Sequence, residues 1–186
     1  RMGTLVAVET DGGAAIAGDR RVTDDGVVES ESAERVFGFE VDSGSVGAGA
    51  LGESGDPGEF RRRLRAELEE ANRRHQGPID VDVLGRVAAR AAERTDVEAV
   101  VAARDGDGVA RIRRVGADGS VLSGEAFALG SGAGIALGRL EAADPSRDLE
   151  STESLVREVL ATVASRDAAT GEAVEVWSLA SDPDGD

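Results

Sequence analysis

The sequence of 186 residues contains no cysteine and a single histidine, His75. Without thiols the chain can form no disulfide framework, and zinc sites built from cysteine and histidine are excluded. Residues 105–108, Asp-Gly-Asp-Gly, lack the further oxygen ligands and the terminal glutamate of an EF-hand, so we interpret them as a hairpin turn. We therefore expect no metal and no cofactor. His75, at the end of a predicted helix, is interpreted as incidental to any chemistry.

Lysine is also absent, because all 21 basic residues are arginine. They are outnumbered by 37 acidic residues, which gives a formal net charge of −16 at pH 7. Molar salt screens repulsion between like charges within about 3 Å, so this composition indicates a halophilic source. The acidic residues are spread along the chain, which disfavours an acidic face made for one basic partner. The charge also disfavours binding to nucleic-acid phosphates.

Long apolar runs are missing. No run approaches the roughly 20 residues that span a bilayer, and no basic and apolar leader precedes the first predicted strand. We expect a soluble cytoplasmic protein with no membrane contact. The length suits one domain, residues 1–180, with an acidic tail at 181–186 that we expect to fray.

Two predicted strands open the chain. Residues 5–8 and 14–17 are apolar, and Asp11-Gly12-Gly13 between them is typical of a tight turn. The second strand leads to Asp19. Apolar patterns predict further strands at residues 27–28, 35–41, 45–51, 97–103, 109–115, 120–122, a segment ending near 129, and 174–180, with Trp177 in the core.

Four stretches have helical periodicity: residues 56–75, 81–95, 132–142 and 154–167. The order is therefore strands, two helices, strands, two helices and a strand. Such blocks predict an α+β fold with antiparallel sheets covered by helix pairs, rather than a doubly wound parallel sheet. We expect a four-layer αββα sandwich.

The glycine-rich segment at residues 130–134, Gly-Ser-Gly-Ala-Gly, permits another interpretation. It follows a predicted strand and opens a helix, as a dinucleotide-binding turn does. However, its third glycine falls one residue early, and no second βαβ half follows. The segment is a weak match to a nucleotide site.

Several segments resemble proteasome β-type subunits, which are threonine proteases of the N-terminal-nucleophile hydrolase superfamily. The resemblance rests on residues 19–23 (Asp-Arg-Arg-Val-Thr), Arg35, residues 130–132 (Gly-Ser-Gly) and residues 165–171 (Ser-Arg-Asp-Ala-Ala-Thr-Gly). It covers almost the whole chain in order. Because the chain enters its first strand almost at once, it is similar to β-type rather than α-type subunits. The resemblance implies a homo-oligomer or a ring with related subunits, and a peptide or unfolded-protein substrate.

The resemblance also implies a set of catalytic residues. Arg35 falls where the family has its catalytic lysine, and Ser131 resembles the serine beside the nucleophile. Asp167 and Thr170 resemble the late aspartate and serine that complete the site. The candidate catalytic residues are Thr4, Asp19, Arg35, Ser131, Asp167 and Thr170.

Substrate-binding residues follow in the same way. Thr23 matches the threonine that hydrogen-bonds the substrate backbone, and Gly49 matches a substrate-contacting glycine. The first specificity pocket is expected to be apolar and lined by Val22, Ala33, Phe37, Gly47 and Leu51.

Two departures bear on activity. Aligning the first hairpin without a gap puts Gly3 at the nucleophile position and Thr4 one residue later, and a one-residue shift in a strand turns a side chain to the opposite face. Gly3-Thr4 also resembles the family's self-processing junction, in which threonine is freed by cleavage after glycine. In addition, Arg35 stays charged above pH 12 and cannot take part in proton transfer as lysine can.

Two function classes remain from the sequence. In the first, Thr4 is released by loss of residues 1–3 and hydrolyses peptides after apolar residues. In the second, the chain keeps the fold as a non-catalytic ring or oligomer subunit, and we expect its N-terminal segment to remain uncut.

Overall fold

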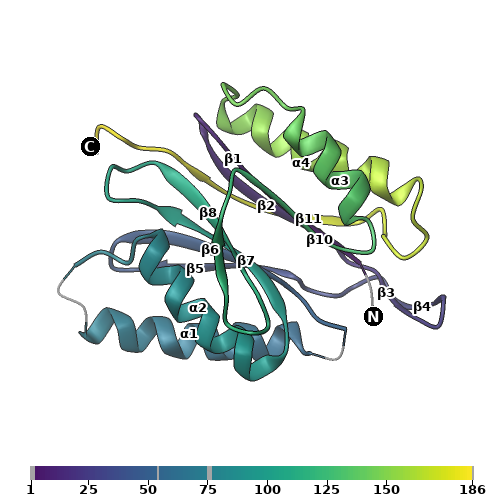
Figure 1. Cartoon of the computed structure of the whole chain (residues 1–186), viewed down its shortest axis with the longest axis horizontal. Helices are drawn as coiled ribbons and strands as arrows, with labels where there is room; N and C mark the ends of the chain where they lie inside the picture. The colour runs from purple at the N-terminus through teal and green to yellow at the C-terminus, as the bar shows by residue number, and fades with distance from the viewer. Residues whose placement is uncertain (1–2, 54, 75–76, 186) are drawn as a thin grey trace.

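The computed structural model describes residues 3–53, 55–74 and 77–185, so His75 lies outside the described residues. The strands are β1 (Thr4–Thr10), β2 (Gly13–Asp19), β3 (Val22–Asp24), β4 (Val27–Ser30), β5 (Val36–Val41), β6 (Gly44–Leu51), β7 (Glu98–Arg104), β8 (Ala110–Val115), β9 (Val121–Ser123), β10 (Ala126–Gly130) and β11 (Val174–Ala180). The helices are α1 (Pro57–Arg74), α2 (Val81–Thr95), α3 (Ala133–Glu141) and α4 (Leu149–Ala164). Their order, visible in Figure 1, is the predicted one.

Two large sheets and one small one are built from these strands. One sheet has the order β10-β1-β2-β11 and another β5-β6-β7-β8-β9, while β3 and β4 form a separate pair. Every strand pairing within the described ranges is antiparallel. The glycine-rich segment runs from the end of the antiparallel strand β10 into the first turn of α3. The nucleotide-binding interpretation is therefore wrong, because that site requires parallel strands.

The alternation of side chains along β1 and β2 separates two apolar layers. Leu5 and Ile16 pack with residues of β7 and β8, between the two large sheets. Val6 and Ala17 point the other way and pack against α3 and α4. Both faces of these strands are thus buried, which explains their nearly continuous apolar sequence.

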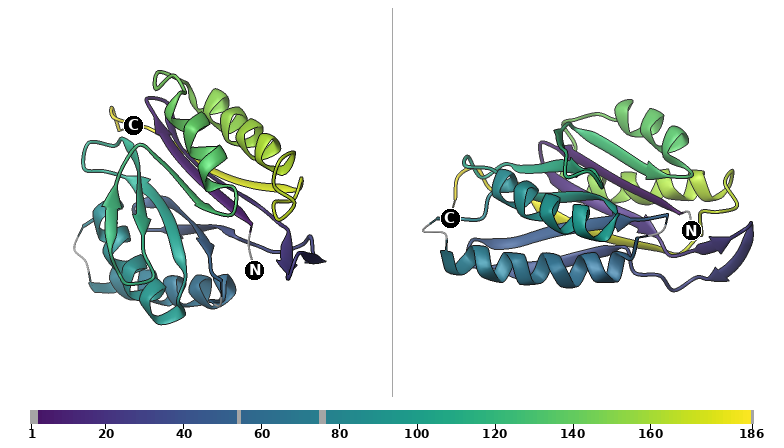
Figure 2. Two further views of the ribbon diagram at one scale, coloured as in Figure 1. Left: turned by 45° about the vertical axis from the view of Figure 1, so that its right-hand side comes forward. Right: turned by 60° about the horizontal axis from the view of Figure 1, so that its bottom comes forward.

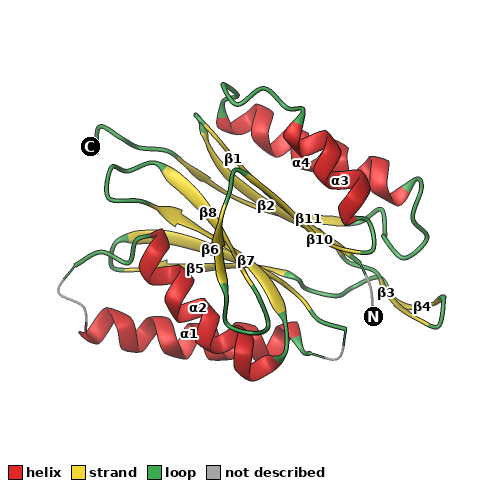
Figure 3. Cartoon of the chain, viewed as in Figure 1, coloured by secondary structure: helices red, strands yellow, loops and turns green. Residues whose placement is uncertain are grey.

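Helix pairs cover the outer faces of the sheets, as Figures 2 and 3 show. Helices α3 and α4 cover the four-stranded sheet, while α1 and α2 cover the five-stranded one. Phe60 and Leu64 of α1 are fully buried in that outer core. The four-layer αββα sandwich and the α+β class are confirmed.

Some element boundaries differ from the prediction. Helix α4 begins at Leu149, five residues before the predicted start, because the side chain of Asp148 accepts a hydrogen bond from the backbone N–H of Ser151 and caps the first turn. The helix ends at Ala164, which leaves Asp167 in the following loop. Strand β3 was not predicted, since three residues with one valine carry little periodic signal.

The first residues beyond β11 are hydrogen-bonded to the rest of the chain. The backbone N–H of Asp182 donates to the carbonyl of Gly108 at 2.8 Å, and Ser181 Oγ accepts from the N–H of Ala110 at 3.1 Å. The end of one sheet is thereby tied to the β7–β8 hairpin of the other. Within the described ranges, no helix combines the length and apolar character needed to cross a membrane.

Candidate functional site

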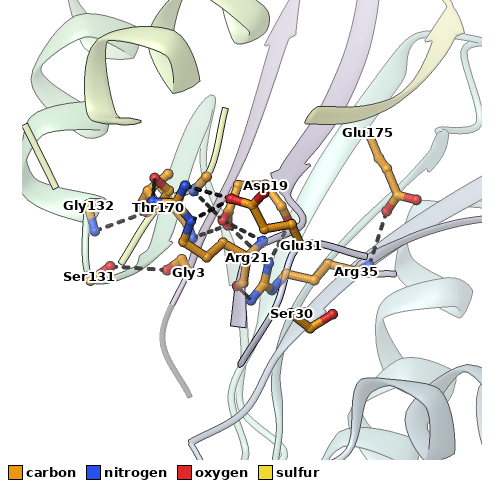
Figure 4. A network of polar contacts seen from close by, with 12 residues as sticks. Gly3, Asp19, Arg21, Ser30, Glu31, Arg35, Ser131, Gly132, Thr170 and Glu175 are labelled. Atoms are coloured by element: carbon orange, nitrogen blue, oxygen red, sulfur yellow. Dashed lines mark hydrogen bonds and ion pairs between the residues drawn. The ribbon is translucent and has the colours of Figure 1, made fainter. Parts of the chain in front are cut away.

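Asp19, at the end of β2, is the centre of a buried polar network (Figure 4). Its side chain is fully buried. Oδ1 accepts from the backbone N–H of Thr4 at 2.8 Å and from Arg35 Nη1 at 3.1 Å. Oδ2 accepts from the N–H groups of Arg21 at 3.0 Å and Gly171 at 2.7 Å. The carboxylate therefore ties together four segments that are distant in sequence.

Arg35, directly before β5, lies against Asp19 and is only 3% exposed. Its Nη1 donates to the Asp19 carbonyl and its Nη2 to the Arg21 carbonyl, each at 2.5 Å. Burial lowers the pKa of the guanidinium from its ordinary value, while the charges of Asp19 and Glu175 act in the opposite direction. Because arginine remains protonated in proteins, this is a buried ion pair.

Thr4 directs its hydroxyl away from this ion pair. Its Oγ1 accepts from the N–H of Gly132 at 3.0 Å and lies 2.7 Å from Thr170 Oγ1. Thr170 Oγ1 donates its one proton to Asp167 Oδ2 at 2.6 Å, so Thr4 must be the donor to Thr170. The result is a directional chain from Gly132 through Thr4 and Thr170 to Asp167. Thr4 itself is fully buried.

Asp167, in the loop after α4, is the final acceptor of these hydrogen bonds. Ser131 Oγ donates to the same Oδ2 at 2.5 Å, and the N–H of Ala169 donates to Oδ1 at 3.1 Å. Burial alone would raise the pKa of Asp167, but the hydrogen bonds from Ser131, Thr170 and Ala169 outweigh it and hold the pKa below its ordinary value. The group is thus held as a carboxylate.

Gly3 lies next to the ion pair of Asp19 and Arg35, and any side chain at this position would point toward that pair. Alternate residues of a strand point to opposite faces, so position 3 shares the face of Leu5 and Thr4 shares that of Val6. A Cβ built on Gly3 would lie 2.5 Å from Asp19 Oδ1 and 2.6 Å from Arg35 Cζ. The Gly3 carbonyl accepts from the backbone N–H of Ser131 at 3.1 Å.

The structure thus brings all six candidate catalytic residues into one connected network. They do not share one face of β1, however. Asp19 and Arg35 lie on the side toward which position 3 points, whereas the hydroxyl of Thr4 lies on the side of Thr170.

A cavity of about 430 Å³ lies beside Arg35. It is lined by Val22, Ala33, Glu34, Arg35, Leu51, Gly52, Gly55, Asp56, Pro57 and Gly58. Val22, Ala33 and Leu51, three of the residues predicted to line an apolar pocket, are among them. The carboxylates of Glu34 and Asp56 add a polar part to the lining that the sequence interpretation did not include.

Other predicted substrate-binding residues lie elsewhere. Phe37 is buried among the residues that pack with α1 and α2, since β5 turns that side chain to its helix-covered face. A side chain on Gly47 would overlap the half-buried Trp177, and one on Gly49 would meet Leu5 and Ile16, so both glycines allow the sheets to approach. Phe37 and Gly47 are therefore not part of the described cavity lining. Thr23 is buried on β3.

The sequence interpretation missed several residues that complete the network. Arg21 donates from its side chain to Glu31 Oε1 at 2.7 Å and to the Ala168 carbonyl at 3.0 Å, linking the β3–β4 pair to the loop after α4. Glu175 accepts from the backbone N–H of Arg35 at 3.2 Å. The available signal for Glu175 was a single acidic residue in the mostly apolar strand β11.

Nothing in the described ranges resembles a metal site: no group of three or more histidine, cysteine, aspartate or glutamate residues could hold an ion there. Asp105 instead accepts from the N–H groups of Asp107 and Val109 within its turn, and from Arg111.

Comparison with known proteins gives a consistent result. A protein-family profile described as "Proteasome subunit" matches residues 1–179. A protein named proteasome subunit beta 1 from Desulfurococcus amylolyticus is 27% identical over 180 residues, which cover 94% of this chain and 87% of that protein. A second proteasome subunit beta 1, from Staphylothermus marinus, is 30% identical over 183 residues, which cover 95% of this chain and 84% of that one. With the sandwich and the network around Asp19, these matches place the chain in the proteasome subunit family, as a subunit of the β type.

Proposed function

We propose that this protein is a proteasome β-type subunit that does not hydrolyse peptides and that serves in a multi-subunit ring or a related oligomer. The single observation that carries the proposal is the orientation of the first residues. Position 3, whose side chain would face Asp19 and Arg35, is glycine, whereas the hydroxyl of the next residue, Thr4, points to the opposite side. The proposal includes one structural domain at residues 1–180.

The chemistry of the two positions supports this proposal. Hydrolysis by a threonine protease of this family needs a hydroxyl that attacks the peptide carbonyl and a base that takes its proton. Gly3 offers no hydroxyl. Arg35, with guanidinium nitrogens bonded to Asp19 and Arg21, cannot release a proton near neutral pH. Thr4 is fully buried, so no substrate can reach its hydroxyl in this arrangement.

A hydrolase that uses Thr4 is the second candidate, and one observation favours it. The hydroxyl of Thr4 donates along a chain that ends on the Asp167 carboxylate, which increases its nucleophilic character. The Gly3 carbonyl, part of the bond whose cleavage would free Thr4, accepts from the Ser131 N–H. This candidate requires that loss of residues 1–3 also uncover Thr4.

Assembly with other subunits is supported by apolar side chains on the surface. Val27 and Val28, 66% and 47% exposed, lie on the β3–β4 pair, which projects from the sandwich (Figures 1 and 2). Exposed apolar groups on a projecting element are typical of contacts between proteins. The proposal places this assembly in a cytoplasm with molar salt, which the charge of −16 supports.

Intact-mass analysis and a peptidase assay test the proposal together. We expect protein purified in molar potassium chloride to retain the residues before Thr4, to leave a fluorogenic apolar peptide uncut, and to gain no mass from a β-lactone, which acylates threonine nucleophiles. An active β-type subunit in the same buffer is the positive control. Peptide turnover that Thr4→Ala abolishes and Thr4→Ser retains, in variants with unchanged thermal midpoints, would overturn the proposal in favour of the hydrolase.

A further inference from the structure

The guanidinium of Arg35 lies in the space that a side chain at position 3 would need. A Cβ on Gly3 would come within 2.5 Å of Asp19 Oδ1 and within 2.6 Å of both Cζ and Nη2 of Arg35. Cβ atoms in real proteins do not approach other heavy atoms so closely, so either the backbone or the ion pair of Asp19 and Arg35 would have to move.

Moving the Arg35 guanidinium would break hydrogen bonds, because both of its terminal nitrogens are bonded to neighbouring oxygens. Nη1 donates to the carbonyl and carboxylate of Asp19, and Nη2 donates to the carbonyl of Arg21. The arginine side chain is 4% exposed and that of Asp19 is fully buried. Displacing the guanidinium would leave a buried carboxylate without its counter-charge, which is strongly unfavourable.

The same geometry explains why arginine suits this place beside a glycine. A lysine ammonium is a compact point charge, whereas the guanidinium is planar and wider and makes directional hydrogen bonds to several acceptors at once. With lysine here and glycine at position 3, the volume of the guanidinium would be left as a cavity. Cavities of this kind destabilise a folded protein.

We propose that Gly3 and Arg35 form a matched pair, in which the arginine fills and closes the position of the missing nucleophile while it neutralises Asp19. The proposal rests on the proposed function, since it explains how the fold tolerates loss of the nucleophile. It predicts that the two residues are energetically coupled, so that a side chain at position 3 is tolerated only when position 35 is smaller.

A double-mutant cycle on thermal stability in molar salt tests the pairing. We expect Gly3→Ala to lower the unfolding midpoint by about 5 °C or more when Arg35 is present, and by less than about 2 °C in the Arg35→Lys background. Gly134→Ala is the matched control, because that glycine lies on the exposed face of α3 with no atom within 4 Å of a built Cβ. Its effect should be small and equal in both backgrounds.

The outcomes separate this proposal from the proposed function. Failure of Gly3→Ala to fold, with recovery in the Arg35→Lys background, supports the pairing in its strongest form. Equal losses in both backgrounds, or failure to fold in both while Gly134→Ala folds, overturn the pairing and leave the proposed function untouched. Conversely, peptide turnover that depends on Thr4 overturns the proposed function. The double-mutant cycle measures stability and not activity, so the two tests can fail independently.

Discussion

Thr4 and Thr170 hold their side-chain oxygens 2.7 Å apart although 166 positions separate them in the sequence. Through this contact the first strand is joined to the loop that follows α4. Thr4 therefore has a structural explanation that does not depend on catalysis, since its hydroxyl satisfies the Gly132 N–H and continues a chain to Asp167.

Thr4→Val is expected to lower the free energy of unfolding by about 1–3 kcal/mol, because valine has nearly the same shape but leaves the buried Gly132 N–H without an acceptor and removes the hydrogen bond that Thr170 Oγ1 accepts. Urea titration in molar salt measures the change. Thr4→Ser keeps the hydroxyl and should retain most of the stability. Equal stability of Thr4→Val and the wild type would contradict the hydrogen-bond chain.

Asp19→Asn is expected to cost about 3–5 kcal/mol of unfolding free energy, because it removes the carboxylate that forms the ion pair with the buried Arg35 guanidinium. The control is Glu70→Gln, which removes the partner of Arg74 on α1, where the side chains are 48% and 77% exposed. Such exposed pairs contribute at most about 1 kcal/mol. Similar losses of unfolding free energy in the two variants would show that the buried pair of Asp19 and Arg35 contributes no more to stability than an exposed pair.

The fold was predictable because it depends on patterns that extend over many residues. The first two strands and α2 have apolar spacing that fixes their type, and Val81–Thr95 and Val174–Ala180 match the predicted ranges. The start of α4 was missed because a single capping side chain, Asp148, decides it. Local patterns thus predicted the elements better than their ends.

The site was predictable only where a family motif marks it. Asp19, Arg35, Ser131, Asp167 and Thr170 come together as the resemblance implied. The resemblance assigned Phe37 and Gly47 to the pocket, but the local sequence does not show which face of the sheet each residue presents. In the structure Phe37 packs with residues of α1 and α2, and a side chain on Gly47 would overlap Trp177. The ungapped alignment of the first hairpin came from the family resemblance, and the assignment of Gly3 to the nucleophile position stays a prediction.

The stability contributed by Asp167 should depend on pH in the acid range. Its folded-state pKa lies below the ordinary value, so the unfolded chain takes up the proton first as the pH falls. The stabilisation is therefore fully present above about pH 4, the ordinary aspartate pKa, and is lost as the pH falls through the lower folded value. The difference in unfolding free energy between wild type and Asp167→Asn should be constant from about pH 7 to 5 and shrink below about pH 4. Ser131→Ala, which removes one donor, should reduce this acid-sensitive part, and a difference that grows toward low pH would contradict it.

Stability should also rise with salt. With a net charge of −16, the folded chain repels itself in dilute buffer, and added ions screen that repulsion. We expect the thermal midpoint to increase across a potassium chloride series from about 0.1 M to molar concentrations. An equimolar comparison with sodium chloride controls for ion identity. A constant midpoint across the series would count against the halophilic interpretation.

The last prediction concerns restoration of a nucleophile. Gly3→Thr alone should remain inactive, because the new side chain meets the Arg35 guanidinium. Gly3→Thr combined with Arg35→Lys places a hydroxyl beside Asp19 together with a cation that can exchange protons. Attack on a peptide carbonyl requires both groups.

The chain must also begin at position 3, so that the α-amine is free. A specific protease site engineered before that residue provides this new N-terminus. We expect the double variant, so cleaved, to add one β-lactone per chain and to cut a fluorogenic apolar peptide at least about 100-fold faster than the wild type, the lower range of what a positioned acid or base contributes. Thr4→Ser in this background should not abolish turnover, since Thr4 faces Thr170. A double variant that folds with the wild-type thermal midpoint and yet takes up no label would show that the position beside Asp19 lacks more than a nucleophile and a lysine.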